Sequence, residues 1–448
     1  MDVRKYLTKE EILERGREII GIPLSEIDKT NKLGVGKGAI GSVVEESWFG
    51  YNANSDSEPD FFEAGVELKV TPYIKTRKGI RAKERLVCNI INYMEEYKNN
   101  FYTSSFWRKC NTMLLMVYEH ISDVSKGDFK IDETILFEFS EEDLLIIEKD
   151  WELIINKVRA GKAHELSEGD TLYLGACTKG ATSASVRQQP FSDIPAKQRA
   201  YSLKQSYMTY ILNNYIFGEQ DNEHIVKDST TLKRRSLEEH IYKRTASYIG
   251  WSQLALIKEF NIDGFPKNIN EILVARMLGV KGKLTATDEL KKAGIIPKTI
   301  RIQKTGSIKE SMSFPGFRFL DIIDEEWEES TLKNYLEPAK FLFIIFKEDN
   351  AGQYVFDRVK FWNIPIDDLN EVKIVWEKTV QIIRYGVKLE YDGNITKNNL
   401  PKQSENRVSH VRPKARDSKD TYPLPDGQEM TKQCFWFNRS YVEEIIKD

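Results

Sequence analysis

The chain has 448 residues, of which 40% are hydrophobic and 30% charged, and its formal net charge is −3. This length exceeds what one ordinary hydrophobic core requires, so two domains are expected. The small negative charge argues against a protein that coats nucleic acid non-specifically, although a local basic cleft can still bind DNA. No apolar run is long enough to span a bilayer, so no membrane partner is expected.

The four cysteines and five histidines are scattered along the chain without metal-ligand spacing. We therefore expect free thiols in a reducing cytoplasm rather than disulfides or a structural zinc site. The N-terminus, from Met1 to Tyr6, has no apolar signal core. These features predict a cytoplasmic location.

Two helices are predicted at the start of the chain. Thr8 can cap an amphipathic helix that runs to about Ile20, with acidic residues in its first turn. A second helix ends at Gly50, a typical glycine C-cap. It carries Glu45 and Glu46 near its C-terminal end, where the helix dipole disfavours acids. An isolated pair of this kind can also be two solvated surface residues.

The stretch from Asp60 to Lys69 carries the strongest chemical signal. The residues after Gly65 alternate between apolar and charged, which predicts a strand with one buried face. Because side chains repeat every two residues in a strand, Glu67 and Lys69 point to the same side. Two carboxylates that converge with an ammonium group suit metal-assisted phosphodiester cleavage. Asp60 and Glu67 would hold Mg²⁺, while Lys69 would orient the attacking water.

The same spacing also arises by chance on exposed strand faces, so the rest of the chain decides its meaning. Further predicted elements are a strand from Lys83 to Ile90, a basic aromatic turn from Ser104 to Cys110, a strand from Met113 to Val117, a helix from Glu142 to Ala160 and a strand from Thr171 to Leu174. Residues 219–235 are polar and without a core pattern, which is typical of a linker. The predicted domains are residues 1–218 and 236–448.

An internal repeat supports two copies of one fold. Gly50 and Gly65 are fifteen residues apart, as are Gly279 and Gly294. The other matches, in chain order, pair Ala64–Lys69 with Ala293–Lys298, Lys83-Glu84 with Lys309-Glu310, Trp151 and Gly161 with Trp376 and Gly386, and Lys204–Tyr207 with Lys432–Phe435.

The two copies differ at the chemical motif. In this register Asp60 becomes Glu289 and Lys69 stays a lysine, Lys298. Glu67 becomes Ile296, which cannot supply a hard oxygen ligand to a metal. We expect the second copy to keep the fold and lose catalysis. Charges that served only the scaffold would have no reason to disappear together from one copy.

Asp60 followed by Gly65-Val-Glu-Leu-Lys69 resembles the core of MutH, the GATC-nicking endonuclease of mismatch repair. Two such domains in one chain resemble the GATC-cutting type II restriction endonucleases of the Sau-three-A kind, and this resemblance runs from about Tyr6 to the C-terminus. It implies an α/β fold of the PD-(D/E)xK type, a mixed sheet flanked by helices, present twice in tandem. It also implies Mg²⁺-dependent cleavage of double-stranded DNA before the G of GATC, leaving 5′ four-base overhangs. The second copy would bind another GATC site as an effector.

The resemblance also implies further site residues. The helix between Gly41 and Gly50 would supply an additional catalytic glutamate, and it has one residue more than the MutH helix. Counting from Gly41 selects Glu45 and counting back from Gly50 selects Glu46, so both stay candidates. Lys109 would lie near the scissile phosphate.

Candidate DNA-binding residues lie in two regions. Those of the first copy lie in the loop from Lys179 to Lys204, both lysines included, with Arg187 and Arg199 between them; those of the second copy are Arg412, Lys414 and Lys432. Arginine and lysine read guanine, but phosphate contacts are more common than base contacts. Cys177 and Thr178 depart from the Arg and Pro that MutH has beside Lys179.

Partners implied by the resemblance are double-stranded DNA, a second chain through dimerisation on DNA, and a cognate DNA methyltransferase of the same restriction system. A different reading of the same residues is a bivalent, sequence-specific DNA-binding protein without catalysis. The intact acids and lysine of the first copy favour the nuclease over that alternative.

Overall fold

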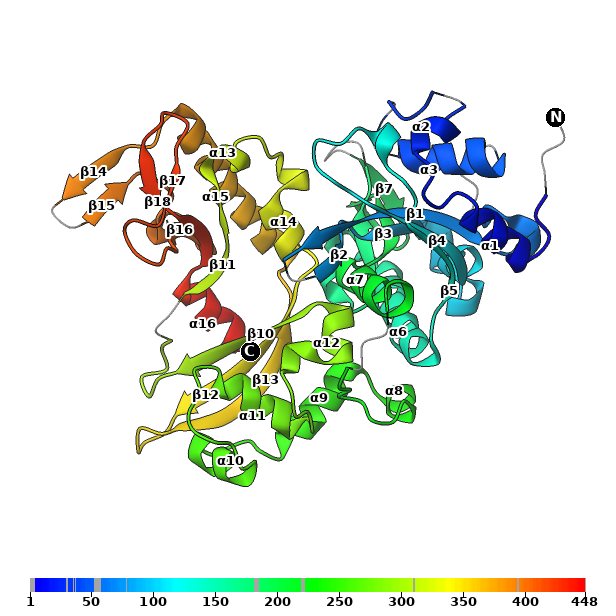
Figure 1. Cartoon of the computed structure of the whole chain (residues 1–448). Helices are drawn as coiled ribbons and strands as arrows, with labels where there is room; N and C mark the ends of the chain where they lie inside the picture. Colours follow the sequence, from blue (N-terminus) through cyan, green and yellow to red (C-terminus); the bar gives the residue numbers. More distant parts are fainter. Residues whose placement is uncertain are drawn as a thin grey trace. The chain divides into compact units, whose positions relative to one another are not determined.

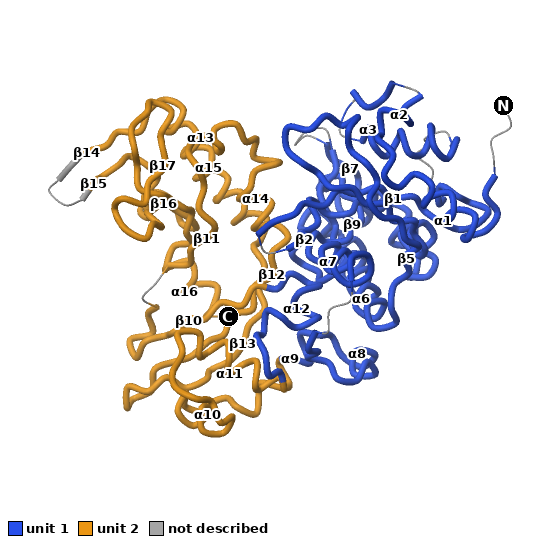
Figure 2. The backbone as a smooth tube through the Cα atoms, in the orientation of Figure 1, with its two compact units in different colours: residues 1–241, 280–295 blue, residues 242–279, 296–448 orange. Residues whose placement is uncertain are grey.

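The computed structural model of the chain (Figure 1) describes residues 5–29, 31–34, 36, 38–51, 58–77, 79–180, 185–218, 222–308, 311–392 and 395–447. The chain divides into two compact units (Figure 2). The first contains residues 1–241 and 280–295, and the second contains residues 242–279 and 296–448. Both units contain helices and sheets, so the fold is of the mixed α/β class.

The main sheet of the first unit has the strand order β2-β1-β4-β5, formed by β2 (Gly79–Ala82), β1 (Glu67–Thr76), β4 (Thr112–Glu119) and β5 (Glu133–Glu138). β1 and β4 are parallel, and the other pairs are antiparallel. β4 lies between two neighbours and is buried from Thr112 to Tyr118, which explains its continuous apolar sequence.

Helices at the start of the chain cover one face of this sheet. α1 (Lys9–Arg17) contacts β4 and β5, and α3 (Ala39–Val43) contacts β1. Thr8 caps α1 with a capping box, as predicted. α3 continues into a π-helical segment, η1 (Val44–Phe49), and the helix ends at Gly50 in the left-handed conformation. Between them lies the short α2 (Leu24–Ile27).

A second sheet of the first unit has the order β3-β9-β6, formed by β3 (Leu86–Ile90), β9 (Arg199–Leu203) and β6 (Leu174–Thr178). A hairpin of β7 (Val186–Gln189) and β8 (Ser192–Lys197) separates β6 from β9 in the chain. The remaining elements are η2 (Phe62–Ala64), α4 (Tyr93–Glu96), η3 (Phe101–Thr103), α5 (Ser105–Cys110), η4 (Lys126–Asp128), α6 (Glu141–Arg159), η5 (Ala163–Glu165), η6 (Glu168–Asp170), α7 (Gln205–Ile211), η7 (Leu212–Ile216) and α8 (Thr230–Arg234).

Two predicted elements of this unit differ in the structure. Residues 105–110, predicted as a turn, form helix α5 because Ser104 caps it, accepting a hydrogen bond from the Trp107 amide. The strand predicted to begin at residue 171 begins only at Leu174. The buried Asp150 carboxylate accepts hydrogen bonds from three consecutive amides there, those of residues 172, 173 and 174.

The second unit also contains two three-stranded sheets. The first has the order β10 (Ile295–Ile302), β12 (Lys340–Glu348), β13 (Tyr354–Trp362), and the second has the order β11 (Met312–Phe317), β19 (Gln433–Phe437), β16 (Ser409–Pro413). Its other elements are α10 (Gln253–Glu259), α11 (Ile269–Met277), α13 (Phe319–Ile322), η9 (Trp327–Glu329), α14 (Thr331–Leu336), α15 (Ile366–Tyr385), the hairpin β14 (Leu389–Asp392) and β15 (Ile395–Asn398), η10 (Gln403–Glu405), the hairpin β17 (Thr421–Pro423) and β18 (Glu429–Thr431), and α16 (Arg439–Lys447).

Corresponding features occur in the same chain order in the two halves of the predicted repeat. Gly65 before β1 and Gly294 before β10 both adopt the left-handed conformation, with φ of +66° and +63°. The long helices α6 and α15 each bury a tryptophan, Trp151 and Trp376. β9 and β19 are the central strands of their three-stranded sheets, β3-β9-β6 and β11-β19-β16. In each case a hairpin, β7-β8 or β17-β18, lies in the chain between the central strand and one of its neighbours, β6 or β16. Lys309 and Glu310 of the predicted repeat lie outside the described residues.

The boundary between the units differs from the predicted linker at residues 219–235. The described part of that segment packs in the first unit, where Ile225 and Leu232 are buried. The Lys149 ammonium donates to the carbonyls of Leu232 and Arg235, at 2.5 and 2.7 Å. The unit boundary instead falls within α9 (Leu237–Ala246). The polar composition of the segment predicted a linker because two buried apolar residues leave no periodicity, and its contacts with Lys149 are made by backbone carbonyls.

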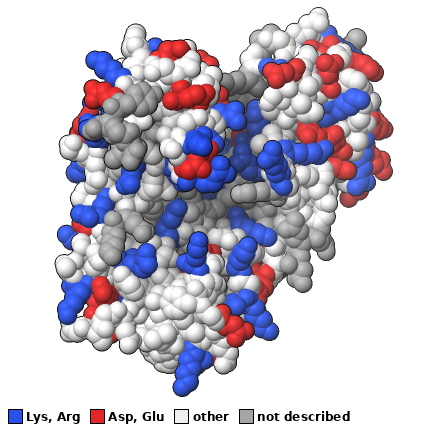
Figure 3. All heavy atoms as spheres, turned by 60° about the vertical axis from the view of Figure 1, so that its left-hand side comes forward, with Lys and Arg blue, Asp and Glu red and all other residues white. Residues whose placement is uncertain are grey.

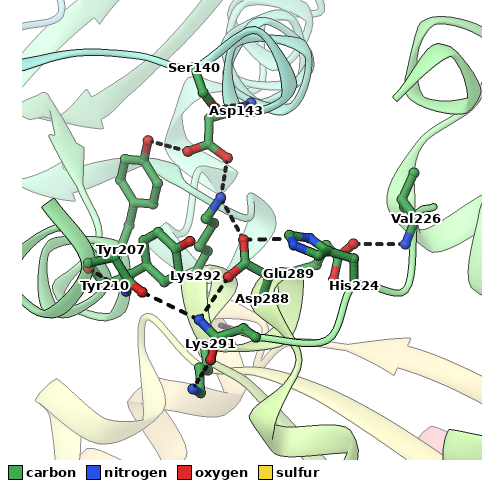
Figure 4. Close-up of polar contacts among 12 residues, drawn as sticks. Ser140, Asp143, Tyr207, Tyr210, His224, Val226, Asp288, Glu289, Lys291 and Lys292 are labelled. Atoms are coloured by element: carbon green, nitrogen blue, oxygen red, sulfur yellow. Dashed lines mark hydrogen bonds and ion pairs between the residues drawn. The ribbon is translucent and has the colours of Figure 1, made fainter. Parts of the chain in front are cut away.

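Residues 280–295 belong to the first unit although they follow residues 242–279 of the second. They contain η8 (Leu284–Ala286) and α12 (Asp288–Ala293), whose buried Lys292 forms ion pairs with Asp143 of α6 and Asp288, at 2.8 and 2.9 Å (Figure 4). The Tyr207 hydroxyl donates to the same Asp143 carboxylate at 2.8 Å. The ring of Tyr210 lies 4.5 Å from the Lys292 ammonium.

Replacing Lys292 with methionine is expected to loosen this contact, because it leaves two buried carboxylates without their cation. Breaking a buried pair in this way costs about 3–5 kcal/mol. Hydrogen exchange of peptides from α7 and α12 should therefore accelerate, by roughly 100-fold or more if exchange follows local opening. The exposed Lys283, replaced in the same way, is the control. Equal exchange in both variants would show that the ion pairs do not hold α12 in place.

Candidate active site

A tight loop brings Asp60 back against the beginning of β1. Phe61 and Val66 form an isolated antiparallel bridge, and the left-handed Gly65 closes the turn between them. The Asp60 amide donates to Glu67 Oε2 at 3.1 Å, and the Leu68 amide donates to Asp60 Oδ2 at 3.0 Å. The structure thus brings together the two carboxylates that the sequence placed on either side of the glycine.

Glu67 and Lys69 lie on the same side of β1, as the period of two predicted. The Lys69 ammonium is 2.7 Å from Glu67 Oε1 and donates to the Cys88 carbonyl of β3 at 3.2 Å. Lys109, from α5, lies 3.5 Å from the same Glu67 oxygen. Only 2% of Glu67 and 8% of Lys109 is exposed, so these charges interact in a poorly solvated place.

The π-helical segment η1 separates the roles of the two candidate glutamates. The Glu46 carboxylate forms an ion pair with Lys32 at 2.5 Å. The Glu45 carboxyl is instead close enough to Asp60 and Glu67 for both carboxylates to raise its pKa. A π-turn holds one residue more than an α-turn. In η1 this turn leaves Glu45 beside the other acids and Glu46 beside Lys32.

Aromatic packing joins the two elements that carry these acids. The ring of Phe49, the last residue of η1, lies 5.0 Å from that of Phe61, the neighbour of Asp60. Tyr6 packs edge-on against both rings, with centroid distances of 5.7 Å. All three rings are buried. The apolar cluster therefore fixes the distance between η1 and the Asp60 loop.

Burial and mutual repulsion change the pKa values of these acids. Burial raises the pKa of Glu67 to about 7, with a further contribution from Asp60, although Lys69 and Lys109 oppose the shift. Burial also raises the pKa of Glu45 to about 7, helped by Asp60 and Glu67. By itself burial lowers the pKa of the Lys69 ammonium, but the Glu67 carboxylate and other neighbours raise it above its ordinary value. Such a cluster favours the binding of a proton or another cation.

Among the described residues, no three His, Cys, Asp or Glu side chains are arranged to hold a metal ion together. The donors at hand are the oxygens of Asp60 and Glu67 and nearby backbone carbonyls. Magnesium commonly takes one or two carboxylates and keeps several waters, so this set of hard oxygens fits it.

The predicted DNA-binding residues of the first unit fall into two groups. Lys179 and Arg187 are exposed. Arg199 and Lys204 are buried, and their side chains donate to the backbone carbonyls of Ala176 and Thr171. In this structure these two side chains therefore lie in the interior rather than at the surface, and their part in DNA binding stays a prediction. Residues 181–184 of the same loop lie outside the described residues.

In the second unit, Arg412 is exposed and stacks on Trp436 at 4.8 Å. The Lys414 ammonium donates to the Phe314 carbonyl at 2.7 Å. Lys432 forms an ion pair with Asp420 at 2.5 Å. Figure 3 shows a face on which many Lys and Arg side chains lie among acidic ones, so a net charge of −3 is compatible with local basic areas.

One predicted match within the repeat is wrong. Lys204 follows the end of β9, whereas Lys432 precedes the beginning of β19. Strand pairing places Arg199 level with Gln433, because each pairs with the last residue of its neighbour, Thr178 or Pro413. The predicted match rested on the shared dipeptide Lys-Gln, which lies at different positions relative to the two strands.

Sequence reasoning also missed three residues at the site. Lys32 neutralises Glu46 from a loop with no recognisable pattern, and Cys88 gives its carbonyl to Lys69. Cys110 is buried beside Cys88, whose pKa is lowered by the hydrogen bond between the two thiols, against the effect of burial. Tertiary contacts between a loop, helices and strands bring these distant positions together, so no spacing in the sequence could have found them.

Comparison with known proteins agrees with this geometry. A family model described as DNA mismatch repair enzyme MutH matches residues 49–150, which include Asp60, Glu67, Lys69 and Lys109. The type II restriction enzyme Sau3AI of Staphylococcus aureus is 39% identical to the chain, and the alignment covers 100% of both sequences. The chain belongs to the Sau3AI family of type II restriction enzymes.

More distant relatives match a smaller part of the chain. The DNA mismatch repair proteins MutH of Shewanella woodyi and Shewanella baltica are each 28% identical to it. These alignments cover 40% and 46% of this chain, and 79% and 95% of the relatives. As a member of the Sau3AI family, the chain is a site-specific deoxyribonuclease, and DNA is its partner. Within the described part of the chain, no helix has the length and apolar character needed to cross a membrane.

The raised pKa of Glu45 predicts a pH-dependent stability of the metal-free protein. The folded state binds this proton more tightly than the unfolded state, whose value is near 4.5. The resulting stabilisation is complete below about pH 4.5 and is lost as the pH rises through about 7. In EDTA, the Tm of Glu45→Gln should therefore rise relative to wild type between pH 5 and 8. Glu142→Gln, in the exposed first turn of α6, is the control, and parallel Tm curves for Glu45→Gln and wild type would contradict the prediction.

Proposed function

We propose that this restriction enzyme uses Mg²⁺ to hydrolyse double-stranded DNA at GATC, cutting before the G and leaving 5′ four-base overhangs. The observation that carries the catalytic part is the convergence of Asp60 and Glu67 beside Lys69 at the start of β1. The resemblance of this motif to MutH and of the whole chain to Sau3AI supports the choice of GATC. The enzyme would act in the cytoplasm, where a cognate DNA methyltransferase of the same system protects the host sites.

The proposed mechanism is an in-line attack of water on one phosphodiester. Asp60 and Glu67 would hold the metal ion, which when bound polarises the phosphate and lowers the pKa of a coordinated water. Lys69 positions the nucleophilic water and stabilises the charge that develops on the phosphate. Lys109 contacts the phosphate at the cut. Glu45 is the more favoured third acid, because Glu46 is already neutralised by Lys32.

We further propose that the chain carries two PD-(D/E)xK domains of MutH type, from residues 1–218 and 236–448. The repeated order of strands and helices along the chain, including the left-handed glycines before β1 and β10, supports this duplication. In the second copy Ile296 takes the place of Glu67, and the carboxylate of Glu289 accepts hydrogen bonds from the Ile225 and Val226 amides. That copy therefore lacks the acids of a metal site.

The role proposed for the second copy is to bind another GATC duplex as an effector. Arg412, Lys414 and Lys432 are its candidate DNA contacts, and Lys179 and Arg187 are those of the first copy. A single catalytic centre per chain cuts one strand at a time, so a double-strand break needs two chains or two events. Dimerisation on DNA through bound sites would supply the second centre.

Substitutions in β1 test the catalytic proposal. Glu67→Gln and Lys69→Met should each lower the rate of GATC cleavage at least about 100-fold, because the first removes a carboxylate that would hold the metal ion and the second removes the ammonium that stabilises the developing charge. Lys75→Met, an exposed position on the same strand, should cleave normally. A plasmid with several GATC sites, incubated with Mg²⁺ or EDTA, gives the rates, and sequencing of its ends gives the cut position. Wild-type rates in the first two variants would contradict the mechanism, and binding without any cleavage by wild type would favour a silent DNA-binding protein.

A second pair of substitutions separates the two glutamates. Glu45→Gln should reduce the cleavage rate at least about 10-fold, because its carboxyl faces the other two acids. Glu46→Gln should stay within roughly 3-fold of wild type, because removing an ion pair with Lys32 affects a partly exposed position. Single-turnover rates at saturating Mg²⁺ make the comparison. The reverse order of the two variants would show that Glu46 is the catalytic acid.

A further inference from the structure

A cavity of about 440 Å³ lies in the second unit beside β10 and β11. Its lining includes Lys298 and Arg301 of β10, the hydroxyl-bearing Ser311 and Ser313, and Tyr354 of β13. Lys298 is the residue that corresponds to Lys69 in the repeat. The Arg301 guanidinium lies over the Tyr354 ring at 5.9 Å, which holds it at the wall of the cavity.

Lys298 is half-buried, and no carboxylate among the described residues forms an ion pair with it. Burial lowers the pKa of Lys298, and the nearby Lys414 lowers it further. Among the described residues no carboxylate pairs with either lysine, and the Lys414 ammonium donates to the Phe314 carbonyl at 2.7 Å. A half-buried lysine without a carboxylate partner, with the exposed Lys414 close enough to lower its pKa, favours the binding of an anion.

The comparison with the first unit shows how this charge arises. Cys88 of β3 and Phe314 of β11 each lie two residues beyond the position where their strand begins to pair with the central strand, β9 or β19. In the first unit Lys69 donates to the Cys88 carbonyl and also pairs with Glu67. In the second unit the Lys414 ammonium donates to the corresponding carbonyl, that of Phe314. The second unit thus has two lysines, Lys298 and Lys414, in the region where the first unit has Lys69 beside the carboxylate of Glu67.

We propose that this cavity binds a phosphodiester of a DNA duplex without a metal ion, with Lys298, Lys414 and Arg301 supplying the positive charge. The proposal rests on the proposed function, in which the second unit binds DNA. In the first unit a divalent cation held by Asp60 and Glu67 would offset the charge of both the acids and the phosphate. In the second copy Ile296 takes the place of Glu67, and no carboxylate of the described residues forms an ion pair with Lys298, so protein cations can neutralise the phosphate directly.

Footprinting of lysines on the full-length protein tests this assignment. Lysines are acetylated in EDTA, with and without a saturating GATC duplex, and the rate at each position is read by mass spectrometry. We expect the duplex to slow the acetylation of Lys298 and Lys414 at least 10-fold without added metal. Lys258, exposed on α10, is the matched control and should react at the same rate in both samples.

The other outcomes separate failure of this proposal from failure of the proposed function. Protection of Lys432 without protection of Lys298 would overturn the phosphate site while leaving DNA binding by the second unit intact. No protection of any lysine in the second unit would overturn both. Protection that needs Mg²⁺ would contradict the metal-free assignment. Equal protection by inorganic phosphate at the same phosphate concentration would show a site for free anions instead of DNA.

A second test measures the Kd of Lys298 variants for the duplex and the dependence of this Kd on salt concentration. In EDTA, Lys298→Gln should raise the Kd for the duplex occupying the second unit about 10-fold. It should also reduce the slope of log K against log salt by about one, the value for one lost phosphate contact. Lys298→Arg should restore both values, because it keeps the charge. An unchanged slope in a folded Lys298→Gln protein would overturn the proposal.

Discussion

The structure is organised around the cost of holding like charges together in a poorly solvated place. Glu45, Asp60 and Glu67 come from a helix, a loop and a strand; besides burial, Asp60 and Glu67 raise the pKa of Glu45, and Asp60 raises that of Glu67. Left alone, such groups would separate or turn to solvent. Aromatic packing between Phe49 and Phe61 prevents this, because the ring contact joins the two backbone segments that carry Glu45 and Asp60. The packing of the apolar cluster thus holds the acids close together, where they can bind a cation.

Much of this site follows from the sequence, for reasons that can be stated. The alternation of apolar and charged residues after Gly65 predicted that Glu67 and Lys69 lie on one face of a strand. The glycine indicated the turn that brings Asp60 back beside this strand. Local rules of this kind depend on a few neighbouring residues. The choice between Glu45 and Glu46 could not be made by counting, because a π-turn changes which side chain a given number of residues directs inward.

Other features escaped the sequence because they depend on distant partners. Arg199 and Lys204 have the composition of DNA contacts, yet backbone carbonyls of neighbouring segments hold their side chains in the interior. The segment after residue 221 seemed to be a linker, yet its amides satisfy the carboxylate of Glu289, some sixty residues later in the chain. Composition describes a side chain's chemistry, whereas its exposure is decided by tertiary contacts.

The discontinuity of the first unit has a consequence for the order in which the protein folds during synthesis. All the strands of its main sheet are complete by residue 138, but the unit also needs α12, whose Lys292 neutralises the buried Asp143. At translation rates of about 5–20 residues per second, the ribosome needs on the order of ten seconds or more to produce the intervening segment. During that interval Asp143 of the nascent chain lacks its cation. The nuclease unit therefore reaches its full stability only after the chain has made part of the second unit.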